Sequence, residues 1–365
     1  MKENQRQYRS GTLEKGLDVL EALERSPEPL RIQDVVSATQ LERAAVFRLL
    51  CTLEDRGYIA RLEDKRYRSK VRKRMPRVFY IAPLSGNSFR DEVTAGIQRA
   101  AEGSGLELQL IDCGDGELPH AEVEKAIAWG AEAVILFQRR GSLAHILADR
   151  FLEAGIPVIS VETPIAGAIY FGGNSYRAGV LAGEALGRFA KTKWKGSFDR
   201  LALLESSLSA AENMARLTGA VEGSEKILGA IPAEKILHVD GLASLEGSRI
   251  ACRKMLKMLP KNSRVLISCF NDISAIGALE AVVEAGREKS TAIVGQNGTE
   301  ESRRELTQKS SALIASVGYF PEKYGEMLMK LADDVVSHRK TPLALYTEHV
   351  LLNHANLKKY YPAVT

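Results

Sequence analysis

The chain has 365 residues, of which 45% are hydrophobic and 26% charged, as in an ordinary globular protein of about two or three domains. Its apolar runs are far shorter than the ~20 residues that cross a bilayer, its first residues are polar with no secretory leader, and its four cysteines form no CxxC pair. We therefore expect a cytoplasmic protein with no membrane span, no disulfide framework and no zinc site.

The net charge of +4 is unevenly distributed. Residues 1–77 hold 18 Lys and Arg against 12 Asp and Glu, whereas residues 78–365 hold 32 against 34. A basic N-terminal part on a near-neutral body indicates a polyanionic partner at one end, with a solvated basic tail as the alternative.

The first seventy residues predict three helices and a hairpin. A helix over 12–25 carries the apolar stripe Leu13, Leu17, Leu20 and Leu23 and ends before the prolines that follow. A short helix over 31–38 and a third over 42–56 come next. The third ends at Gly57, a residue common at helix C-termini, and short strands are expected over 58–62 and 65–70.

This layout is typical of a winged helix-turn-helix, in which the third helix enters the major groove and the hairpin approaches phosphates. The predicted DNA-binding residues lie on the outer face of that helix and on the hairpin: Arg43, Ala44, Phe47, Arg48, Arg61, Lys65, Arg66 and Arg68. A protein-docking module is the alternative, but the cationic helix face and basic hairpin favour DNA.

Residues 12–70, including the stretch RLLCTLEDRGYI, resemble the DNA-binding domain of the IclR family. Members of that family usually place Ser-Thr near the start of the recognition helix, where this chain has Ala44 and Ala45. The resemblance therefore implies the module, with different individual contacts. The usual effector domain of the family does not follow.

A basic connector over 71–77 tracks the DNA backbone or is a solvated linker. Beyond it, β-rich runs alternate with helical stretches, which predicts parallel sheets covered on both faces. Because 78–365 is long for one such sheet, we expect two lobes. The runs are 78–84, 107–113, 133–137, 157–162, 201–205, 235–240, 264–270, 291–297 and 313–319.

Almost all of 78–350 resembles the type 1 periplasmic binding proteins and the effector domains of the lac-repressor family. The resemblance rests on the order and spacing of IAPLSGNSFRDEVTAGIQRAAEGSG, AGIPVISVETP, RVLISCFNDISAIGALEAV, TAIVGQNGT and ASVGYFPEKYGE. It implies one lobe over 78–175 and 320–347, a second lobe over 176–319, and a C-terminal segment over 348–365.

The resemblance also implies a pocket between the lobes, since ligands of open α/β sheets bind beyond the carboxyl ends of strands. Sugar-binding relatives usually have Asp-Arg at Glu162-Thr163, Asp at Asn297 and Gln at Tyr319, so ribose is not expected. Amides and a ring still suit a sugar or another polar ring compound. The predicted lining is Phe89, Glu162, Thr163, Arg216, Leu242, Asn271, Asn297 and Tyr319.

Several of these residues have a structural alternative. Asn271 is placed to cap a helix, as are Asp272 and Ser175, and capping is compatible with binding. Phe89 is either core or pocket wall, and Arg216 is either a pocket residue or a surface arginine. A carboxylate at the end of a strand, such as Glu162, needs water, a ligand or a partner.

No GxGxxG follows the first strand, and P-loop, HExxH and GxSxG motifs are absent, so we expect neither an enzyme nor a cofactor. We expect a homodimeric, ligand-responsive transcription regulator whose partners are operator DNA and a small sugar-like effector. The alternatives are a solute-binding protein of a transport system and an enzyme with an unrecognised α/β site.

Overall fold

The structure is a computed structural model that describes residues 10–26, 28–70, 75–83, 88–114, 120–138, 140–209 and 214–363. The chain forms two compact units, Met1–Met75 and Pro76–Thr365. Residues 71–74 of the predicted basic connector lie outside the described residues, as do 84–87 at the end of the first predicted strand of the second unit.

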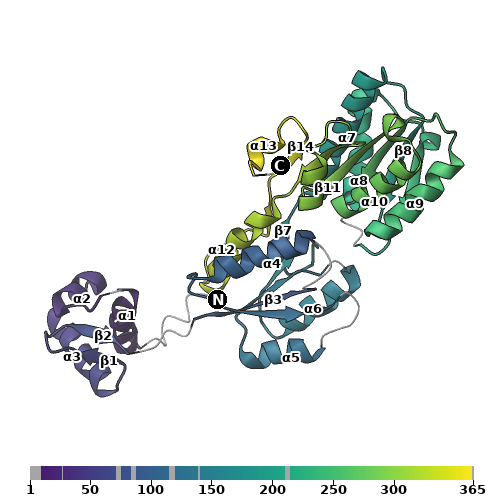
Figure 1. Ribbon diagram of the computed structural model, residues 1–365. Helices are drawn as coiled ribbons and strands as arrows, with labels where there is room; N and C mark the ends of the chain where they lie inside the picture. Colours follow the sequence, from purple (N-terminus) through teal and green to yellow (C-terminus); the bar gives the residue numbers. More distant parts are fainter. Residues whose placement is uncertain are drawn as a thin grey trace. The chain divides into compact units, whose positions relative to one another are not determined.

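The first unit is a winged helix-turn-helix, as predicted (Figure 1). Its elements are α1 (Gly11–Arg25), α2 (Ile32–Thr39), α3 (Arg43–Asp55) and the antiparallel strands β1 (Ile59–Arg61) and β2 (Tyr67–Ser69). Gly57, at φ +79°, lets the chain turn sharply after α3. The core joins all five elements through Val19, Leu23, Val35, Val46, Leu50, Ile59 and Tyr67.

The predicted apolar stripe of the first helix is only partly the buried face. Leu23 is buried, but Leu13 and Leu17 are 62% and 48% exposed. Gly16 faces α3, where an added Cβ would lie 3.7 Å from the Leu49 side chain, and Val19 is buried. The contact face therefore follows Gly16, Val19 and Leu23, because the small glycine allows the close approach that a leucine would prevent.

The second unit contains two six-stranded sheets, which confirms the predicted two-lobed α/β fold. The first sheet has the order β13-β7-β6-β5-β3-β4 and is entirely parallel. Its strands are β3 (Arg77–Ala82), β4 (Glu107–Asp112), β5 (Ala133–Leu136), β6 (Val158–Val161), β7 (Ile169–Gly172) and β13 (Ala344–Tyr346). The accompanying helices are α4 (Ser88–Ala101), α5 (His120–Trp129), α6 (Gly141–Glu153) and α12 (Tyr324–Val336).

The second sheet has the order β14-β12-β11-β10-β8-β9 and is parallel except for β14. Its strands are β8 (Arg200–Glu205), β9 (Ile236–Asp240), β10 (Val265–Cys269), β11 (Thr291–Asn297), β12 (Leu313–Gly318) and β14 (Val350–Leu352). Its helices are α7 (Ser175–Lys193), α8 (Ala215–Leu228), α9 (Leu245–Met258), α10 (Asp272–Glu284) and α11 (Glu300–Glu305), and the short α13 (Leu357–Tyr360) lies near the C-terminus.

The chain passes between the two sheets at 172–175, 318–324 and 346–350. These crossings contact one another, since Thr347 N donates to Gly172 O at 2.9 Å and Asn174 N donates to His349 Nε2 at 2.9 Å. A Cβ on Gly173 would collide with the Tyr319 ring, so only glycine fits there. The crossings thus form one packed hinge between the lobes.

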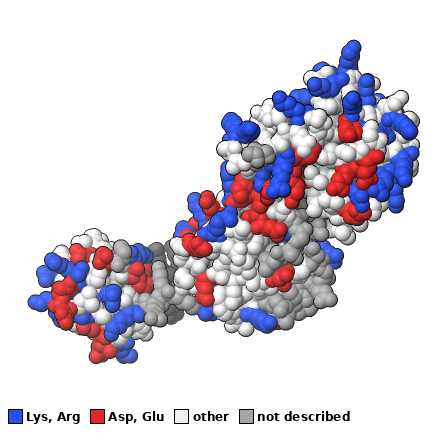
Figure 2. All heavy atoms as spheres, in the orientation of Figure 1, with Lys and Arg blue, Asp and Glu red and all other residues white. Residues whose placement is uncertain are grey.

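The described helices include none that is both long and apolar enough to cross a membrane. All four cysteines are free thiols, and only Cys51 is exposed. On the face of the first unit drawn in Figure 2, basic and acidic side chains are interspersed. The basic excess of this unit is therefore not one continuous patch on that face.

Candidate DNA interface and candidate ligand site

The outer face of α3 carries every residue that the sequence predicted for the DNA-facing helix. Arg43, Ala44, Phe47 and Arg48 are all exposed, whereas Val46 and Leu50 point into the core. The first turn of α3 has no acidic residue. The positive end of the helix dipole and both guanidinium groups therefore remain available to a polyanion.

The wing presents cations at a tight turn. Arg61, Lys65 and Arg68 are exposed, and Lys65 adopts φ +63°. Arg66 is half-buried, and its guanidinium is paired with the carboxylate of Asp64, so its charge is partly compensated. Arg61, Lys65 and Arg68 are therefore the wing residues better placed for phosphate contacts.

In the second unit, Glu162 directly follows β6 and has a strained backbone at φ +60°. Its side chain is buried, and Oε1 accepts hydrogen bonds from Tyr324 Oη at 2.6 Å and from Gly173 N at 3.0 Å. Burial raises the pKa of the Glu162 carboxyl. The partner that this carboxylate needs is thus supplied by α12 and the hinge.

Arg216 is buried on α8 rather than on the surface, with 4% of the residue exposed. Nη1 donates to Phe270 O at 2.8 Å and Nη2 to Ser175 Oγ at 3.1 Å. The guanidinium lies 4.5 Å from the Phe270 ring centre and 5.7 Å from that of Tyr319. Nε has no hydrogen-bond partner among the described residues.

Phe89 and Tyr319 are packed in one aromatic cluster from both lobes. The Phe89 ring meets Phe137, Tyr319 and Tyr324 edge-on, with centroids 6.2, 6.3 and 5.6 Å away. Tyr319 is 1% exposed, and its hydroxyl donates to Gln296 Oε1 at 2.9 Å. Phe89 therefore belongs to the core, in contact with a predicted pocket residue.

Asn271 lies two residues after β10, and Asn297 is the last residue of the neighbouring strand β11. Asn271 caps α10, since its Oδ1 accepts from Ser274 N at 3.0 Å, so the capping role is real. Asn297 sits at φ +116°, and its carbonyl accepts from Tyr319 N at 3.0 Å. Both side chains thus start from the carboxyl edge of the same sheet.

The remaining predicted residues differ in their surroundings. Thr163 is buried and donates to Gln138 O at 3.0 Å. Leu242 is 42% exposed and lines a surface groove of about 470 Å³ between β9 and α9, which none of the other predicted pocket residues lines. Ser175 is the first residue of α7, and the cap is Asn174, whose Oδ1 accepts from Arg177 N.

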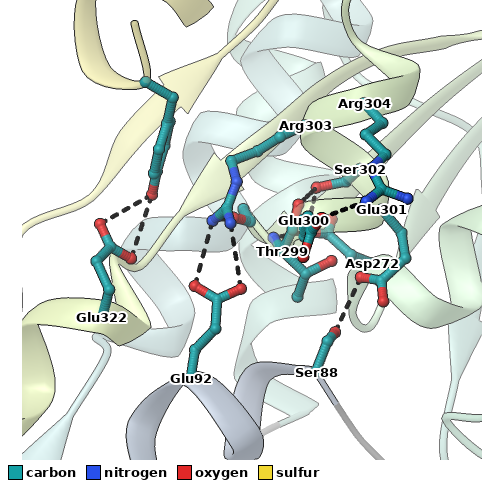
Figure 3. Close-up of polar contacts among 12 residues, drawn as sticks. Ser88, Glu92, Asp272, Thr299, Glu300, Glu301, Ser302, Arg303, Arg304 and Glu322 are labelled. Atoms are coloured by element: carbon teal, nitrogen blue, oxygen red, sulfur yellow. Dashed lines mark hydrogen bonds and ion pairs between the residues drawn. The ribbon is translucent and has the colours of Figure 1, made fainter. Parts of the chain in front are cut away.

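Asp272 organises the loop after β11, a role that its place beside a cap did not reveal (Figure 3). Its Oδ2 accepts from Thr299 N at 2.8 Å and Ser302 Oγ at 2.7 Å, and its Oδ1 accepts from Ser316 Oγ at 2.6 Å. Burial raises the pKa of Asp272 to about 6. The carboxyl ties α10, the loop after Asn297 and β12 together.

Polar contacts also join the lobes, from α4 to α11 (Figure 3). Ser88 Oγ donates to Glu301 Oε2 at 2.9 Å, and both terminal nitrogens of Arg303 reach Glu92, at 3.2 and 3.4 Å. Arg303 Nη1 also donates to Gly298 O at 2.7 Å, directly after Asn297. The sequence could not predict the Ser88–Glu301 and Glu92–Arg303 pairs, whose members lie more than 200 positions apart.

Tyr324 and His349 are hinge residues that the sequence did not single out. Tyr324 lies within a stretch already matched by resemblance, but no periodicity marks it. His349 packs at 4.4 Å against the Tyr319 ring, and burial lowers its pKa to about 4. The imidazole is therefore neutral near pH 7, with Nε2 accepting from Asn174 N. The described residues include no metal-binding group of three His, Cys, Asp or Glu side chains.

Comparison with known proteins extends these observations. Residues 78–340 match the model of the periplasmic binding protein domain, and residues 12–63 match that of the IclR helix-turn-helix domain. Neither describes an enzyme. No curated protein sequence matches the chain.

Three solved structures illustrate the fold of the second unit. A periplasmic solute-binding protein from Actinobacillus succinogenes with bound D-allose is 20% identical, with a TM-score of 0.67 over 78% of this chain and 100% of that one. A glucose-galactose binding protein from Geobacillus stearothermophilus is 22% identical, with a TM-score of 0.66 over 78% and 99%.

A solute-binding protein from Bacillus halodurans with bound myo-inositol is 17% identical, with a TM-score of 0.69 over 80% of this chain and 99% of that one. At these identities the likeness establishes the fold. The domain model, in contrast, covers most of the sequence. The chain therefore belongs to the periplasmic binding protein domain family and carries an IclR-type helix-turn-helix domain ahead of that domain.

Proposed function

We propose that this protein is a ligand-responsive transcription regulator. Its winged helix binds operator DNA, and its second unit binds a sugar or a related polyhydroxylated compound between the two lobes. The observation that carries the proposal is the combination in one chain of an exposed cationic recognition helix with a periplasmic binding protein domain. A DNA partner also implies a cytoplasmic location.

The chemistry near the hinge supports a polar ring compound as effector. The Asn271 and Asn297 amides, the Arg216 guanidinium and the Tyr319 ring come from strand ends or a neighbouring helix. Rings pack against sugar faces, and amides both donate to and accept from hydroxyls. D-allose and myo-inositol, each bound by a protein of the same fold, are suitable first probes.

The mechanism follows from the hinge. A ligand held between the lobes favours their closed arrangement by its differential affinity for that state. In a homodimer, closure would change the half-site spacing that the two winged helices can reach, and half-sites must match the helical repeat of DNA. Whether the effector strengthens or weakens DNA binding depends on which arrangement fits the operator.

The experiment is selection of bound duplexes from a random DNA library with the full chain, followed by gel-shift titration of wild type and Arg48→Ala. We expect one enriched sequence that wild type binds with a strong salt dependence and that Arg48→Ala binds at least tenfold more weakly. Lack of DNA binding would instead favour a second candidate, a transport solute-binding protein, which the names of the similar structures support.

A further inference from the structure

The exposed face of α3 combines two kinds of side chain. Arg43 and Arg48 supply the cations, and Ala44, Phe47 and Cys51 are the exposed apolar or weakly polar side chains between and after them. The stretch 43–51 contains no Ser, Thr, Asn or Gln. The hydroxyl of the exposed Thr52 that follows donates a hydrogen bond to Arg48 O, at 2.9 Å.

Phe47 is conspicuous on this face because 48% of it is exposed and it is outside the core of the winged helix. The exposed half of this side chain contributes no apolar burial to folding. Removal of that apolar surface from water by a partner would lower the free energy of the complex.

Base chemistry restricts what such a face can read in a major groove. Guanine accepts two hydrogen bonds from an arginine, adenine is paired by Asn or Gln, and cytosine donates to a carboxylate. Thymine alone offers a methyl group, which side chains such as Ala and Phe contact. Residues 43–51 therefore contain readers for guanine and thymine but no amide for adenine, and the nearest carboxylate that could pair with cytosine is that of Glu42, the exposed N-cap.

We propose that Phe47, with Ala44 beside it, reads a thymine methyl in each operator half-site, next to guanine contacted by Arg43 or Arg48. This inference rests on the proposed DNA-binding function and specifies its substrate class. The operator would be defined on this helix by guanine edges and thymine methyls. The residue that determines the thymine position would make no hydrogen bond.

Replacement of single thymines by deoxyuridine tests this inference, because the change removes the methyl and leaves every hydrogen-bonding group in place. Duplexes selected with the full chain are resynthesised with one deoxyuridine at a time and titrated with wild type and Phe47→Ala. At one thymine per half-site, we expect a loss of about fourfold for wild type, as for one buried methylene-sized group. Phe47→Ala should bind the two duplexes equally.

Two variants serve as controls. Leu17→Ala removes an apolar side chain of the same 48% exposure from α1, so it should keep the wild-type response to deoxyuridine. Phe47→Leu retains an apolar side chain and should restore part of the response. Thermal unfolding of each variant tests whether the winged helix is folded. We expect it to be folded, because Phe47 lies outside the core of the first unit.

The outcomes separate the two claims. If no DNA is retained in the selection, the proposed function fails and this inference fails with it. If a sequence is retained but no thymine shows a methyl effect that depends on Phe47, the inference alone is wrong. A thymine whose methyl matters equally to wild type and Phe47→Ala would also contradict it.

Discussion

Among single residues, His349 should make the stability of the hinge depend on pH. Its Nε2 accepts from Asn174 N, its ring packs against Tyr319, and burial is the main cause that lowers its pKa to about 4. Protonation would remove the acceptor and place a cation in a partly buried site. The folded state therefore favours the neutral imidazole, relative to an unfolded chain in which histidine titrates near pH 6.5.

Because the folded pKa is depressed, the stability that His349 contributes is present above pH 6.5 and is lost as the pH falls through about 4. A shift of this size corresponds to about 3 kcal/mol. We expect His349→Gln, whose amide oxygen can still accept from Asn174, to flatten the fall in unfolding free energy between pH 7 and pH 4. Chemical denaturation at a series of pH values measures it.

Asp272 must be considered in the same experiment. Its pKa is raised to about 6, so its own contribution to stability decreases as the pH rises through about 6. The contribution of Asp272 is the same in wild type and in His349→Gln. The difference in unfolding free energy between the two proteins therefore reports on the histidine alone. Parallel stability curves for the two proteins would show that His349 does not titrate in this way.

Asn271 has two separable roles, because its side chain caps α10 and starts from the carboxyl edge of the sheet. Serine is an equally good N-cap but lacks the amide, so Asn271→Ser should keep the unfolding free energy within about 0.5 kcal/mol. If Asn271 also bonds the effector, calorimetric titration of this variant should show at least a tenfold loss of affinity. Unchanged effector affinity in the folded variant would leave Asn271 a cap alone.

The sequence predicted individual site residues unevenly, for physical reasons. The strand-end positions of Glu162, Asn271 and Asn297 could be located because the period changes there, and their contact with an effector stays a prediction. Leu242 was placed in the pocket by resemblance alone, and it lines a surface groove that none of the other predicted residues lines. Contacts between remote positions, such as Tyr324 with Glu162, leave no local pattern at all.

At the scale of the element, α7 and α8 pack more closely than side chains would allow. A Cβ on Gly183 of α7 would collide with the Ala220 carbonyl oxygen of α8, and one on Gly223 of α8 would collide with the Val180 carbonyl oxygen of α7. The backbones of the two helices are therefore in direct contact. Glycine lowers the helix propensity at these positions, and the close packing of the two helices compensates for that loss.

Gly183→Ala should therefore destabilise the second unit by about 1–3 kcal/mol, because the helices must move apart. Gly16→Ala is the matched control: it too lies within a helix, but its Cβ would meet only the Leu49 side chain, at 3.7 Å. That change should be neutral or stabilise α1 by up to about 1 kcal/mol. Calorimetric unfolding measures both, and an equally stable Gly183→Ala would contradict the packing account.

Most elements could be predicted because their apolar pattern is strong. The nine strands predicted for the second unit are all present, with ends that shift by at most two residues. The strands that were missed, β7, β13 and β14, contain three or four residues each. Unlike the equally short β5 and β6, they are not fully buried apolar runs, and β13 and β14 pair with the edge of a sheet formed by earlier parts of the chain.

At the scale of the whole molecule, lobe closure should depend on the pair between Glu92 of α4 and Arg303 of α11. The side chains are only 22% and 10% exposed, so the pair is less screened than a surface ion pair. Arg303 also holds Gly298, beside Asn297, and stacks 4.3 Å from the Tyr361 ring. Loss of the pair favours open lobes without removal of any predicted ligand contact.

We expect Arg303→Gln to lower effector affinity about three- to tenfold, as measured by calorimetric titration. Arg304→Gln is the matched control, since Arg304 is 72% exposed and pairs with Glu300 within α11 itself. That variant should bind the effector like wild type. Equal affinities of both variants and wild type would show that the pair does not contribute to closure.

Effector binding in the second unit should change DNA binding by the winged helix. The direct measurement is the DNA affinity of the full chain, with and without a saturating amount of a compound that raises its melting temperature, starting from D-allose, myo-inositol and glucose. We expect at least a fivefold change in affinity for the selected operator, with a midpoint at the effector concentration that half-saturates the second unit. An operator affinity that stays constant when the second unit is saturated with effector would show that the two units are not coupled.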